Sequence, residues 1–494
     1  MEINEIFSEG FSLKDNVIHL KLLIGGKWEE ASEYVNIYSP IDQTLVAKIP
    51  VPSKDQVEKA LNEGIKAEGL ISSMPLFERL DILSKFKEQL VLFKENLAKV
   101  LMKESGKTYN QAVSEIESTI LRLNLSQSDL RAFVGEYIRG DIASDKLHKF
   151  AIVLREPLGL VLGISPFNYP FFTSYSKVIP AILAGNPIIL KPPSADPVAF
   201  ILSTVLLNRL LPPGVVQVLT LPGSAMDSLV SDPRIKVISF TGSTAVGKHI
   251  AKLAGDKKLH LELGGKGTAI VLENADLSLA AKEIVKGSIS LSGQRCDAVS
   301  RVLVVEKVKD KFLELVKAEL NNYKLGNPEL DNSANLGPVI SKDASARING
   351  MVKDAVSKGA KLIYGGSFKD TYHDITLLSD VPLSATIANE ETFGPVITII
   401  TVKDKEDAIK IANQSNYGLD SCVFTNDINE AYECARRLNV GSVTINAAPS
   451  HGSTIFPFGG VKDSGIGKEG IVYSIKEMTY EKTIVFNLNN DLPS

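Results

Sequence analysis

A carboxylate and a thiol stand at the two ends of residues 262–296. Glu262 opens this stretch and Cys296 closes it, with a strand-like run and a helix-like run between them. A thiolate can attack a carbonyl carbon and hold the product as a thioester. A carboxylate can then take a proton from water, and that water releases the acid. The pair therefore predicts covalent chemistry at a carbonyl carbon.

The residues beside this pair favour a chemical role over a packing role. Taken singly, a cysteine is usually a small buried hydrophobe and a glutamate is usually a solvated charge. Gly264, Gly265 and Gly293 allow the backbone to turn or to approach another group closely. Gln294 and Arg295 do not suit a buried structural cysteine, and a neighbouring guanidinium favours the thiolate.

The two motifs together carry a resemblance to a known family. Glu-Leu-Gly-Gly-Lys at 262–266, followed by Gly-Gln-Arg-Cys at 293–296, resembles the signature pair of the aldehyde dehydrogenase superfamily. The similarity runs from Gly25-Gly26-Lys27-Trp28 to Phe458-Gly459-Gly460. Within the superfamily the chain looks most like the archaeal non-phosphorylating, NADP-dependent glyceraldehyde-3-phosphate dehydrogenases. The resemblance implies oxidation of D-glyceraldehyde 3-phosphate to 3-phosphoglycerate, a glycolytic reaction, with NADP as cofactor and NAD as a second acceptor.

The resemblance also implies a mechanism. Cys296 attacks the aldehyde carbon, Asn168 and the backbone N–H of Cys296 hold the oxyanion, and hydride passes to the nicotinamide. Glu262 then activates the water that hydrolyses the thioester. No metal is needed, and no Cys or His spacing suggests one.

Other interpretations change either the substrate, the reaction or the class of protein. Within the family the substrate could instead be succinic semialdehyde, lactaldehyde or glyceraldehyde. Acylating, coenzyme A-dependent relatives lack a glutamate at the position of Glu262. An inactive structural or binding homologue would not need Asn168, Glu262, Cys296 and Glu391 together.

Bulk composition limits the class of protein. A chain of 494 residues should divide into two or three domains. A formal net charge of -4 gives no reason to expect nucleic acid or a membrane as a partner. Three cysteines are too few for a disulfide framework, and the N-terminus does not resemble a signal peptide. A cytoplasmic location is the expectation.

Alternating periodicities predict an α/β fold. Strands and helices alternate over residues 158–254, which indicates a parallel sheet with helices on both faces. We expect a Rossmann-type cofactor domain at 1–136 and 157–258, and a second α/β catalytic domain at 259–474. Residues 137–156 and 475–494 are expected to form a small oligomerisation β-arm, which in the family pairs with another subunit in dimers or tetramers. A local hairpin without a partner is the alternative.

The loops after the predicted strands carry the remaining candidates. Ligands in such sheets bind beyond the carboxyl ends of the strands. Phe167 and Asn168 follow the strand at 160–164, and Lys177 lies in the next helix, near the site. A glycine-rich turn into a helix can bind a pyrophosphate. The resemblance implies cofactor contacts from this turn and other loops, namely Phe167, Lys191, Ser194, Gly242, Ser243, Gly247, Glu391 and Phe393.

Two features concern selectivity. Many NAD-preferring relatives carry a glutamate where this chain has Ser194, so Ser194 with Lys191 favours NADP. For the phosphorylated aldehyde, the resemblance suggests contacts from Arg295, Tyr169, Arg122 and His451. Arg122 lies in a predicted helix at 108–134, where a solvated helix face is the simpler interpretation. His451 stands where bacterial relatives carry an arginine.

Overall fold

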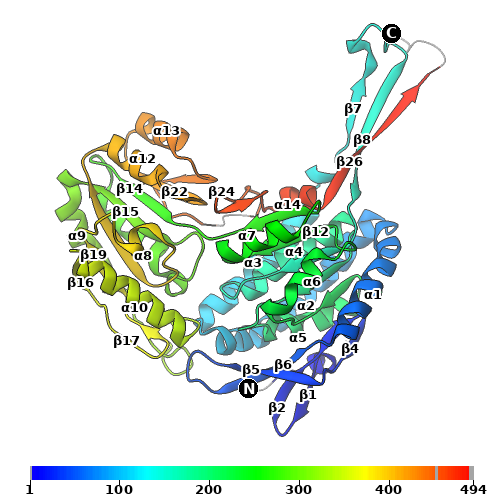
Figure 1. Ribbon diagram of the computed structural model, residues 1–494, viewed down its shortest axis with the longest axis horizontal. Helices are drawn as coiled ribbons and strands as arrows, with labels where there is room; N and C mark the ends of the chain where they lie inside the picture. The colour runs from blue at the N-terminus through cyan, green and yellow to red at the C-terminus, as the bar shows by residue number, and fades with distance from the viewer. Residues whose placement is uncertain (1–2, 451–453, 489–494) are drawn as a thin grey trace.

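The computed structural model describes residues 3–450 and 454–488. Figure 1 shows two α/β bodies side by side and a β-arm that projects from one of them. Both bodies are built as the periodicities predict, with a mainly parallel sheet covered by helices on both faces. The arrangement confirms the predicted fold class.

The first sheet has eight strands in the order β25-β13-β12-β9-β10-β11-β3-β4. Its parallel core consists of β9 (Val161–Ile164), β10 (Ile188–Lys191), β11 (Val216–Val218), β12 (Val237–Thr241) and β13 (Lys258–Glu262). The edges are added antiparallel by β3 (Leu22–Ile24), β4 (Lys27–Glu29) and β25 (Gly465–Ile466). The strands are too hydrophobic to face water, and buried residues of the covering helices pack on both faces.

Helices of this body cover its sheet in two layers. One layer includes α2 (Leu76–Ser105), α3 (Tyr109–Ser128), α4 (Pro170–Ala184), α5 (Val198–Asn208) and α14 (Ile471–Glu477). The other includes α1 (Lys54–Ser72), α6 (Met226–Ser231) and α7 (Thr244–Leu253). Ser53 caps α1 as predicted, with its hydroxyl accepting from Gln56 N at 3.2 Å while the Gln56 side chain accepts from Ser53 N at 3.1 Å.

The chain reverses its direction of winding between β9 and β12. After β9 it adds β10 and β11 on one side, and then returns to place β12 on the other side of β9. The loops that follow β9 and β12 therefore diverge and leave a crevice at the carboxyl edge of the sheet, the usual position for a ligand. Asn168 lies in the first of these loops and Gly242 in the second.

The second sheet has seven strands in the order β16-β19-β20-β15-β14-β22-β23. Six strands are parallel: β14 (Gly267–Val271), β15 (Val299–Val305), β19 (Thr376–Ser379), β20 (Val396–Val402), β22 (Asp420–Phe424) and β23 (Ser442–Ile445). The antiparallel β16 (Lys361–Tyr364) forms one edge. Helices α8 (Leu277–Ile289) and α9 (Glu306–Leu320) pack on one face. On the other face are α10 (Lys342–Ser357), α12 (Lys405–Asn413) and α13 (Ile428–Arg437).

The boundary between the bodies differs from the one predicted at residue 258. Strands β13 and β25 both lie in the first sheet, although residues 259–474 were expected to form the second domain. Helix α14 also packs in the core of the first body. Glu262, the last residue of β13, therefore belongs to the first sheet. A strand pattern does not show which sheet the strand joins: β13 continues the first sheet beside β12, and β25 joins it from far away in the sequence.

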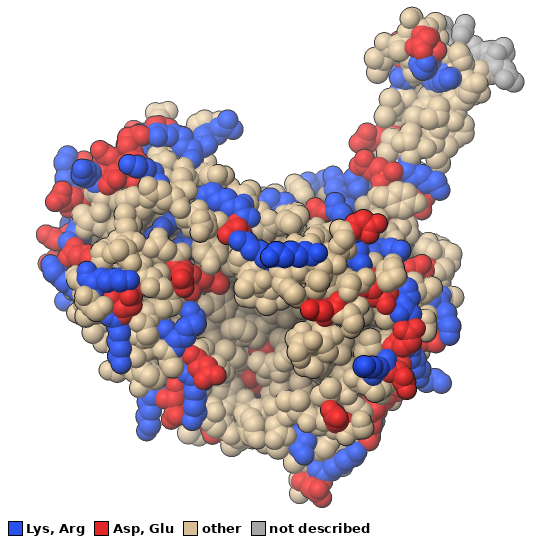
Figure 2. Space-filling view, in the orientation of Figure 1, with Lys and Arg blue, Asp and Glu red and all other residues tan. Residues whose placement is uncertain are grey.

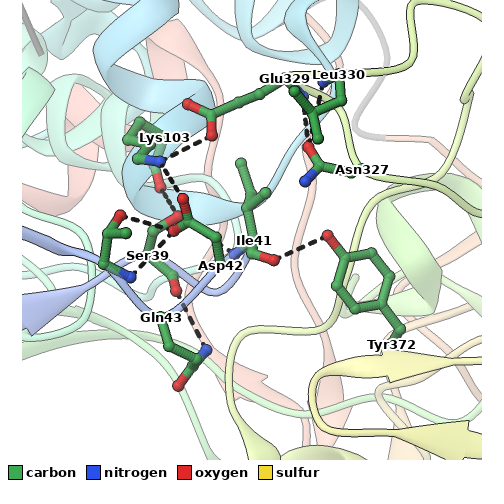
Figure 3. A network of polar contacts seen from close by, with 10 residues as sticks. Ser39, Ile41, Asp42, Gln43, Lys103, Asn327, Glu329, Leu330 and Tyr372 are labelled. Carbon is green, nitrogen blue, oxygen red and sulfur yellow. Dashed lines mark hydrogen bonds and ion pairs between the residues drawn. The ribbon is translucent and has the colours of Figure 1, made fainter.

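Ion pairs and a hydrogen bond join the two bodies. Lys103, near the end of α2, places Nζ 2.8 Å from Asp42 Oδ2 and 2.8 Å from Glu329 Oε2 (Figure 3). The Tyr372 hydroxyl, from the second body, donates to the Ile41 carbonyl at 3.0 Å. The segment around Ile41 thus bridges the first and second bodies, and their facing edges are held at a fixed separation.

The arm is a three-stranded sheet formed within one chain. Strands β7 (Glu136–Arg139) and β8 (Lys149–Pro157) form a hairpin, and β26 (Thr479–Asn487) pairs antiparallel along the whole of β8. Apolar side chains remain exposed on it, among them Tyr137 at 60% and Val485 at 61%. Figure 2 shows few charged side chains along the shaft of the arm.

No helix within residues 3–450 and 454–488 is long and apolar enough to cross a bilayer.

Candidate active site

Two cavities meet between the bodies, where Figure 2 shows the surface hollowed. The strand-end cavity, of about 620 Å³, lies at the carboxyl edge of the first sheet. The helix-side cavity, of about 600 Å³, is lined largely by α3, α4 and the loop before β15. Their linings share Asn168, Thr241, Glu262 and Cys296. The structure thus brings the three predicted catalytic residues together at the junction of two pockets.

The segment between the two sheets has no space for side chains at its centre. It runs from Glu262, at the end of β13, to the start of β14 at residue 267. A Cβ on Gly265 would lie 2.4 Å from the Cys296 carbonyl oxygen, and one on Gly264 would lie 2.9 Å from Glu391 Oε2. The N–H of Gly265 donates to Glu391 Oε1 at 3.1 Å. Close approach explains both glycines, since neither has a positive φ.

The loop that carries the thiol has a tightly specified backbone. Leu291, Ser292 and Gly293 have φ values of 56°, 54° and 69°, a left-handed region that is unfavourable for the first two. A Cβ on Gly293 would lie 2.0 Å from the Gly394 carbonyl oxygen. The loop therefore packs directly on the turn that follows Phe393, and this contact fixes the position of Cys296.

The charges around Cys296 do not favour a thiolate in the free protein. Burial raises the pKa of the Cys296 thiol well above its usual value, and the carboxylates of Asp297 and Asp420 raise it further. The Arg295 guanidinium instead binds Asp297, with Nε and Nη2 at 2.9 and 2.8 Å from its two oxygens. The expectation of a lowered thiol pKa beside Arg295 is therefore wrong, because burial and the carboxylates outweigh the charge of Arg295, which also pairs with Asp297.

Glu262 is a buried carboxyl poised to hold a proton. Burial raises its pKa well above the usual value, and the negative charge of Glu469 adds to the effect. The positive charges of Lys177 and Lys468 act in the opposite direction. Lys177 Nζ donates to Thr241 Oγ1 at 2.7 Å, and burial lowers its pKa to about 8. Lys177 thus lies beside the site without lining either cavity, as predicted.

Asn168 lies in the short loop between β9 and α4, and only 7% of it is exposed. It lines both cavities, and the neighbouring Pro170 begins α4 at a position where a missing N–H costs nothing. The loop is therefore fixed at both ends. Donation of its amide to an oxyanion remains a prediction.

Seven of the eight predicted cofactor residues line the strand-end cavity: Phe167, Lys191, Ser194, Gly242, Ser243, Glu391 and Phe393. The exception is Gly247, which does not line it. A Cβ there would lie 2.2 Å from Leu263 Cδ2, so this glycine lets α7 pack closely against the chain after β13. The Gly-x-x-x-x-Gly spacing from Gly242 and the resemblance predicted a cofactor contact, which remains a prediction.

The strand-end cavity has features that fit a dinucleotide. Ser243 caps α7, whose first-turn N–H groups and positive dipole end can hold a pyrophosphate. Lys191 Nζ donates to Ser194 Oγ at 3.0 Å, and burial lowers the pKa of Lys191 to about 8. The rings of Phe167 and Phe393 meet edge to face at 5.6 Å near the junction with the thiol.

Sequence reasoning did not identify three residues that line this cavity. Arg347 donates to the Thr392 carbonyl at 2.6 Å and so supports the loop of Glu391. His249 and Asp227 pair at 2.9 Å. These residues lie on separate helices and loops, so no local motif joins them.

The helix-side cavity contains two of the four predicted substrate residues, Arg295 and Tyr169. His451 lies outside the described residues. Arg122 is only 1% exposed and does not line the cavity. Its Nη1 lies 3.1 Å from Glu469 Oε1, so it is neither a solvated helix residue nor a direct substrate contact. Burial of that face of α3 by α4 and the C-terminal segment explains the difference.

A second cation, Lys107, lines this cavity and was not predicted. Its ammonium forms a buried ion pair with Glu115 and lies 4.9 Å from the Tyr169 ring centroid. Glu115 Oε1 also accepts the N–H groups of Phe171 and Phe172, at 2.9 and 3.0 Å, in the first turn of α4. The only available signal was a lysine eight residues before a glutamate, which does not distinguish a buried pair from a solvated one.

A methyl group at position 265 should disturb the junction. Gly265→Ala places Cβ against the Cys296 carbonyl, and overpacking of this kind costs about 1–3 kcal/mol. We expect a clear drop in the thermal unfolding temperature. The matched control is Gly350→Ala in α10, where a Cβ meets open space. It should leave the temperature unchanged or raise it, and equal effects of the two substitutions would contradict the close approach.

Cys296 should alkylate slowly at neutral pH. Because its pKa is raised, the rate constant for iodoacetamide should keep increasing through pH 9, beyond the usual thiol pKa of about 8.5. Cys422 and Cys434 are both 0% exposed, so a Cys296→Ser variant should remain unlabelled. A rate constant that reaches its plateau below pH 8 would show a thiolate in the free protein.

Comparison with known proteins places these features in one family. Residues 28–484 match the model of the aldehyde dehydrogenase family. One relative is an NADP-dependent glyceraldehyde-3-phosphate dehydrogenase of Streptococcus equinus, with 40% identity over 473 residues. The match covers 95% of this chain and 98% of the relative. The chain is 37% identical over 472 residues, 94% of its length and 100% of the relative's, to a lactaldehyde dehydrogenase of Methanocaldococcus jannaschii.

A solved structure agrees at the level of the whole fold. The NADP complex of the NADP-dependent glyceraldehyde-3-phosphate dehydrogenase from Bacillus halodurans superposes with a TM-score of 0.92 at 38% identity. The match covers 95% of this chain and 99% of that one. With a thiol, a carboxyl and an amide at the junction of two cavities, and with a family match along almost its full length, this chain belongs to the aldehyde dehydrogenase family.

Proposed function

We propose that the protein oxidises D-glyceraldehyde 3-phosphate to 3-phosphoglycerate with NADP, without consuming inorganic phosphate. The observation that carries this proposal is the junction of the two cavities at Cys296, Glu262 and Asn168. It lets an aldehyde in the helix-side cavity meet a nicotinamide in the strand-end cavity. Relatives named for this reaction, at 40% and 38% identity, support the choice of substrate and cofactor.

The residues divide the chemistry between them. The Cys296 thiol loses its proton, and Sγ bonds to the aldehyde carbon. The Asn168 amide and the backbone N–H of Cys296 donate to the oxyanion. When bound, the nicotinamide supplies the acceptor for the hydride. Glu262 takes one proton from water as the hydroxyl bonds to the thioester carbon. The bond between that carbon and Cys296 Sγ then breaks, which releases the acid and returns Cys296 as a thiolate.

The helix-side cavity offers cations for a phosphate, but both have partners. Arg295 is paired with Asp297, and Lys107 with Glu115. Phosphate must therefore compete with a carboxylate for Arg295. This pairing favours a second candidate substrate, an uncharged aldehyde such as lactaldehyde. One of the relatives is a lactaldehyde dehydrogenase.

Steady-state kinetics with a small set of aldehydes tests the proposal. The substrates are glyceraldehyde 3-phosphate, glyceraldehyde, lactaldehyde and succinic semialdehyde, with NADP and no added phosphate or coenzyme A. We expect glyceraldehyde 3-phosphate to lead in kcat/KM, and Glu262→Gln to stop turnover after one equivalent of NADPH. A lead by lactaldehyde would select the second candidate.

Asp297→Asn separates the two candidates further. It removes the carboxylate that competes for Arg295 while preserving the side-chain shape. A hydrogen bond to a charged group is worth about 1.5–3 kcal/mol, so kcat/KM for the phosphorylated aldehyde should increase about tenfold or more relative to lactaldehyde. A decrease in this ratio would mean that phosphate does not bind at Arg295.

Cofactor preference should depend on Ser194. A glutamate there, beside Lys191, could accept from the ribose hydroxyls of NAD and would repel the extra phosphate of NADP. Ser194→Glu should lower the NADP-to-NAD ratio of kcat/KM by about tenfold or more. A tenfold change corresponds to a difference of about 1.4 kcal/mol between the two cofactors. Ser194→Ala is the control for loss of the hydroxyl alone, and an unchanged ratio in the glutamate variant would exclude Ser194 as a determinant.

The exposed apolar arm supports a homo-oligomer. Strands β26 and β7 are the edges of the arm sheet, and exposed edges with apolar side chains are typical of surfaces that pair with another chain. The double variant Tyr137→Asp and Val485→Asp should sediment as a smaller species than the parent. Leu330→Asp, at a site 85% exposed in the second body, is the matched control. Identical sedimentation of all three proteins would exclude the arm as the interface.

A further inference from the structure

A buried histidine lies directly behind the proposed general base. His260 and Glu262 are two residues apart on β13, so their side chains lie on the same face of the sheet. His260 is 2% exposed. Its Nδ1 lies 3.1 Å from the Ser239 hydroxyl on β12, where the two residues are opposite each other in the strand pairing. Its Nε2 lies 3.4 Å from Glu262 Oε1.

The facing atoms of this pair have no side-chain hydrogen bond within the described residues. Within the described residues, His260 Nε2 and both carboxyl oxygens of Glu262 are buried without a hydrogen bond. The backbone N–H of Glu469 also approaches the carboxyl, but it donates to the Phe458 carbonyl at 2.6 Å. Leaving buried polar atoms unpaired is costly, and catalytic hydrogen bonds are often long before substrate binds. A small rotation would join Nε2 to Oε1.

We propose that His260 is a positioning residue for Glu262, donating its Nε2–H to Oε1 so that Oε2 is left to take the proton from water. The proposal rests on Glu262 being the base of the proposed function. The Ser239 hydroxyl can donate to Nδ1, and in that arrangement the ring proton resides on Nε2. No bond to carbon or sulfur changes at His260, and the ring keeps its proton throughout.

The surroundings keep the ring neutral in the pH range of an assay. Burial lowers the pKa of His260 to about 4, helped by Lys177 on α4, Arg122 on α3 and Lys258 on β13, and opposed by Glu469. Glu262 itself faces Glu469, Lys177 and Lys468. The pKa of His260 thus lies below the pH range of the assay, and loss of the donor at position 260 should raise the pKa of the Glu262 carboxyl.

The test compares two substitutions of similar size. His260→Gln retains an N–H donor that can reach Glu262, whereas His260→Met does not. NADPH formation is followed through the first turnover and into the steady state from pH 5.5 to 9.5, and the acyl-enzyme is measured by quenching and mass spectrometry. Thermal unfolding of each variant shows whether it is folded, and Ser239→Ala, which frees the tautomer without changing the ring, serves as a second probe.

We expect hydrolysis alone to respond. In His260→Met the hydrolysis rate at pH 7 should fall about tenfold, its pH midpoint should rise by about one unit, and acyl-enzyme should accumulate, while the first-turnover rate changes less than twofold. The hydrolysis rate of His260→Gln should stay within threefold of that of the parent. Ser239→Ala should shift the pH midpoint in the same direction as His260→Met, but by a smaller amount.

Two results would overturn the role of His260. One is an unmoved pH midpoint in His260→Met and Ser239→Ala. The other is an equal fall of the first-turnover and hydrolysis rates, which a purely structural residue would produce. If the parent enzyme forms no NADPH with any aldehyde, the proposed function fails instead, and the two failures are therefore distinguishable.

Discussion

A close backbone contact at Gly265 sets the geometry of the rest of the site. The carboxyl edge of the first sheet faces the amino edge of the second, and residues 263–266 join them directly. Because Gly265 lies against the Cys296 carbonyl, the separation between thiol and carboxyl is fixed by main-chain packing. Glu391 accepts from the same glycine, so the strand-end cavity is tied to that contact as well. Flexible side chains alone could not fix the thiol, the carboxyl and the strand-end cavity relative to one another. The ion pairs of Lys103 also hold the two bodies together.

Paired charges surround two buried groups whose pKa values are raised. Lys107 with Glu115, Arg295 with Asp297 and Arg122 with Glu469 are ion pairs at or behind the helix-side cavity. In a buried environment such pairs cost desolvation and maintain geometry more than they add stability. Cys296 and Glu262 lie between them without an equivalent partner, and burial raises the pKa of both.

Local signals in the sequence predicted the parts of the structure that local forces determine. Strand and helix periodicities, the Ser53 cap and the loops at strand ends were confirmed because hydrophobic spacing and turn chemistry act over a few residues. The errors concern contacts across long separations. Arg122 is buried by Glu469, 347 residues away, and β25 joins the first sheet by pairing with β13, far away in the sequence. Arg295 differs, since its partner is only two residues away, but a single sequence does not show whether such a pair forms.

The same reasoning places substrate selectivity on Asp297 more than on Arg295. A phosphate that takes the Nε and Nη2 hydrogens of Arg295 displaces Asp297, which accepts from them at 2.9 and 2.8 Å. The displaced carboxylate then needs another partner in a buried setting. Its near neighbour Asp420 is also a carboxyl, with neither oxygen hydrogen-bonded in the described residues and with a pKa raised by burial and by Asp297. Two adjacent carboxylates can remain buried only if one holds a proton. Binding of a phosphorylated aldehyde through these two hydrogens of Arg295 therefore moves Asp297 away from its ion pair, whereas an uncharged aldehyde leaves the ion pair intact.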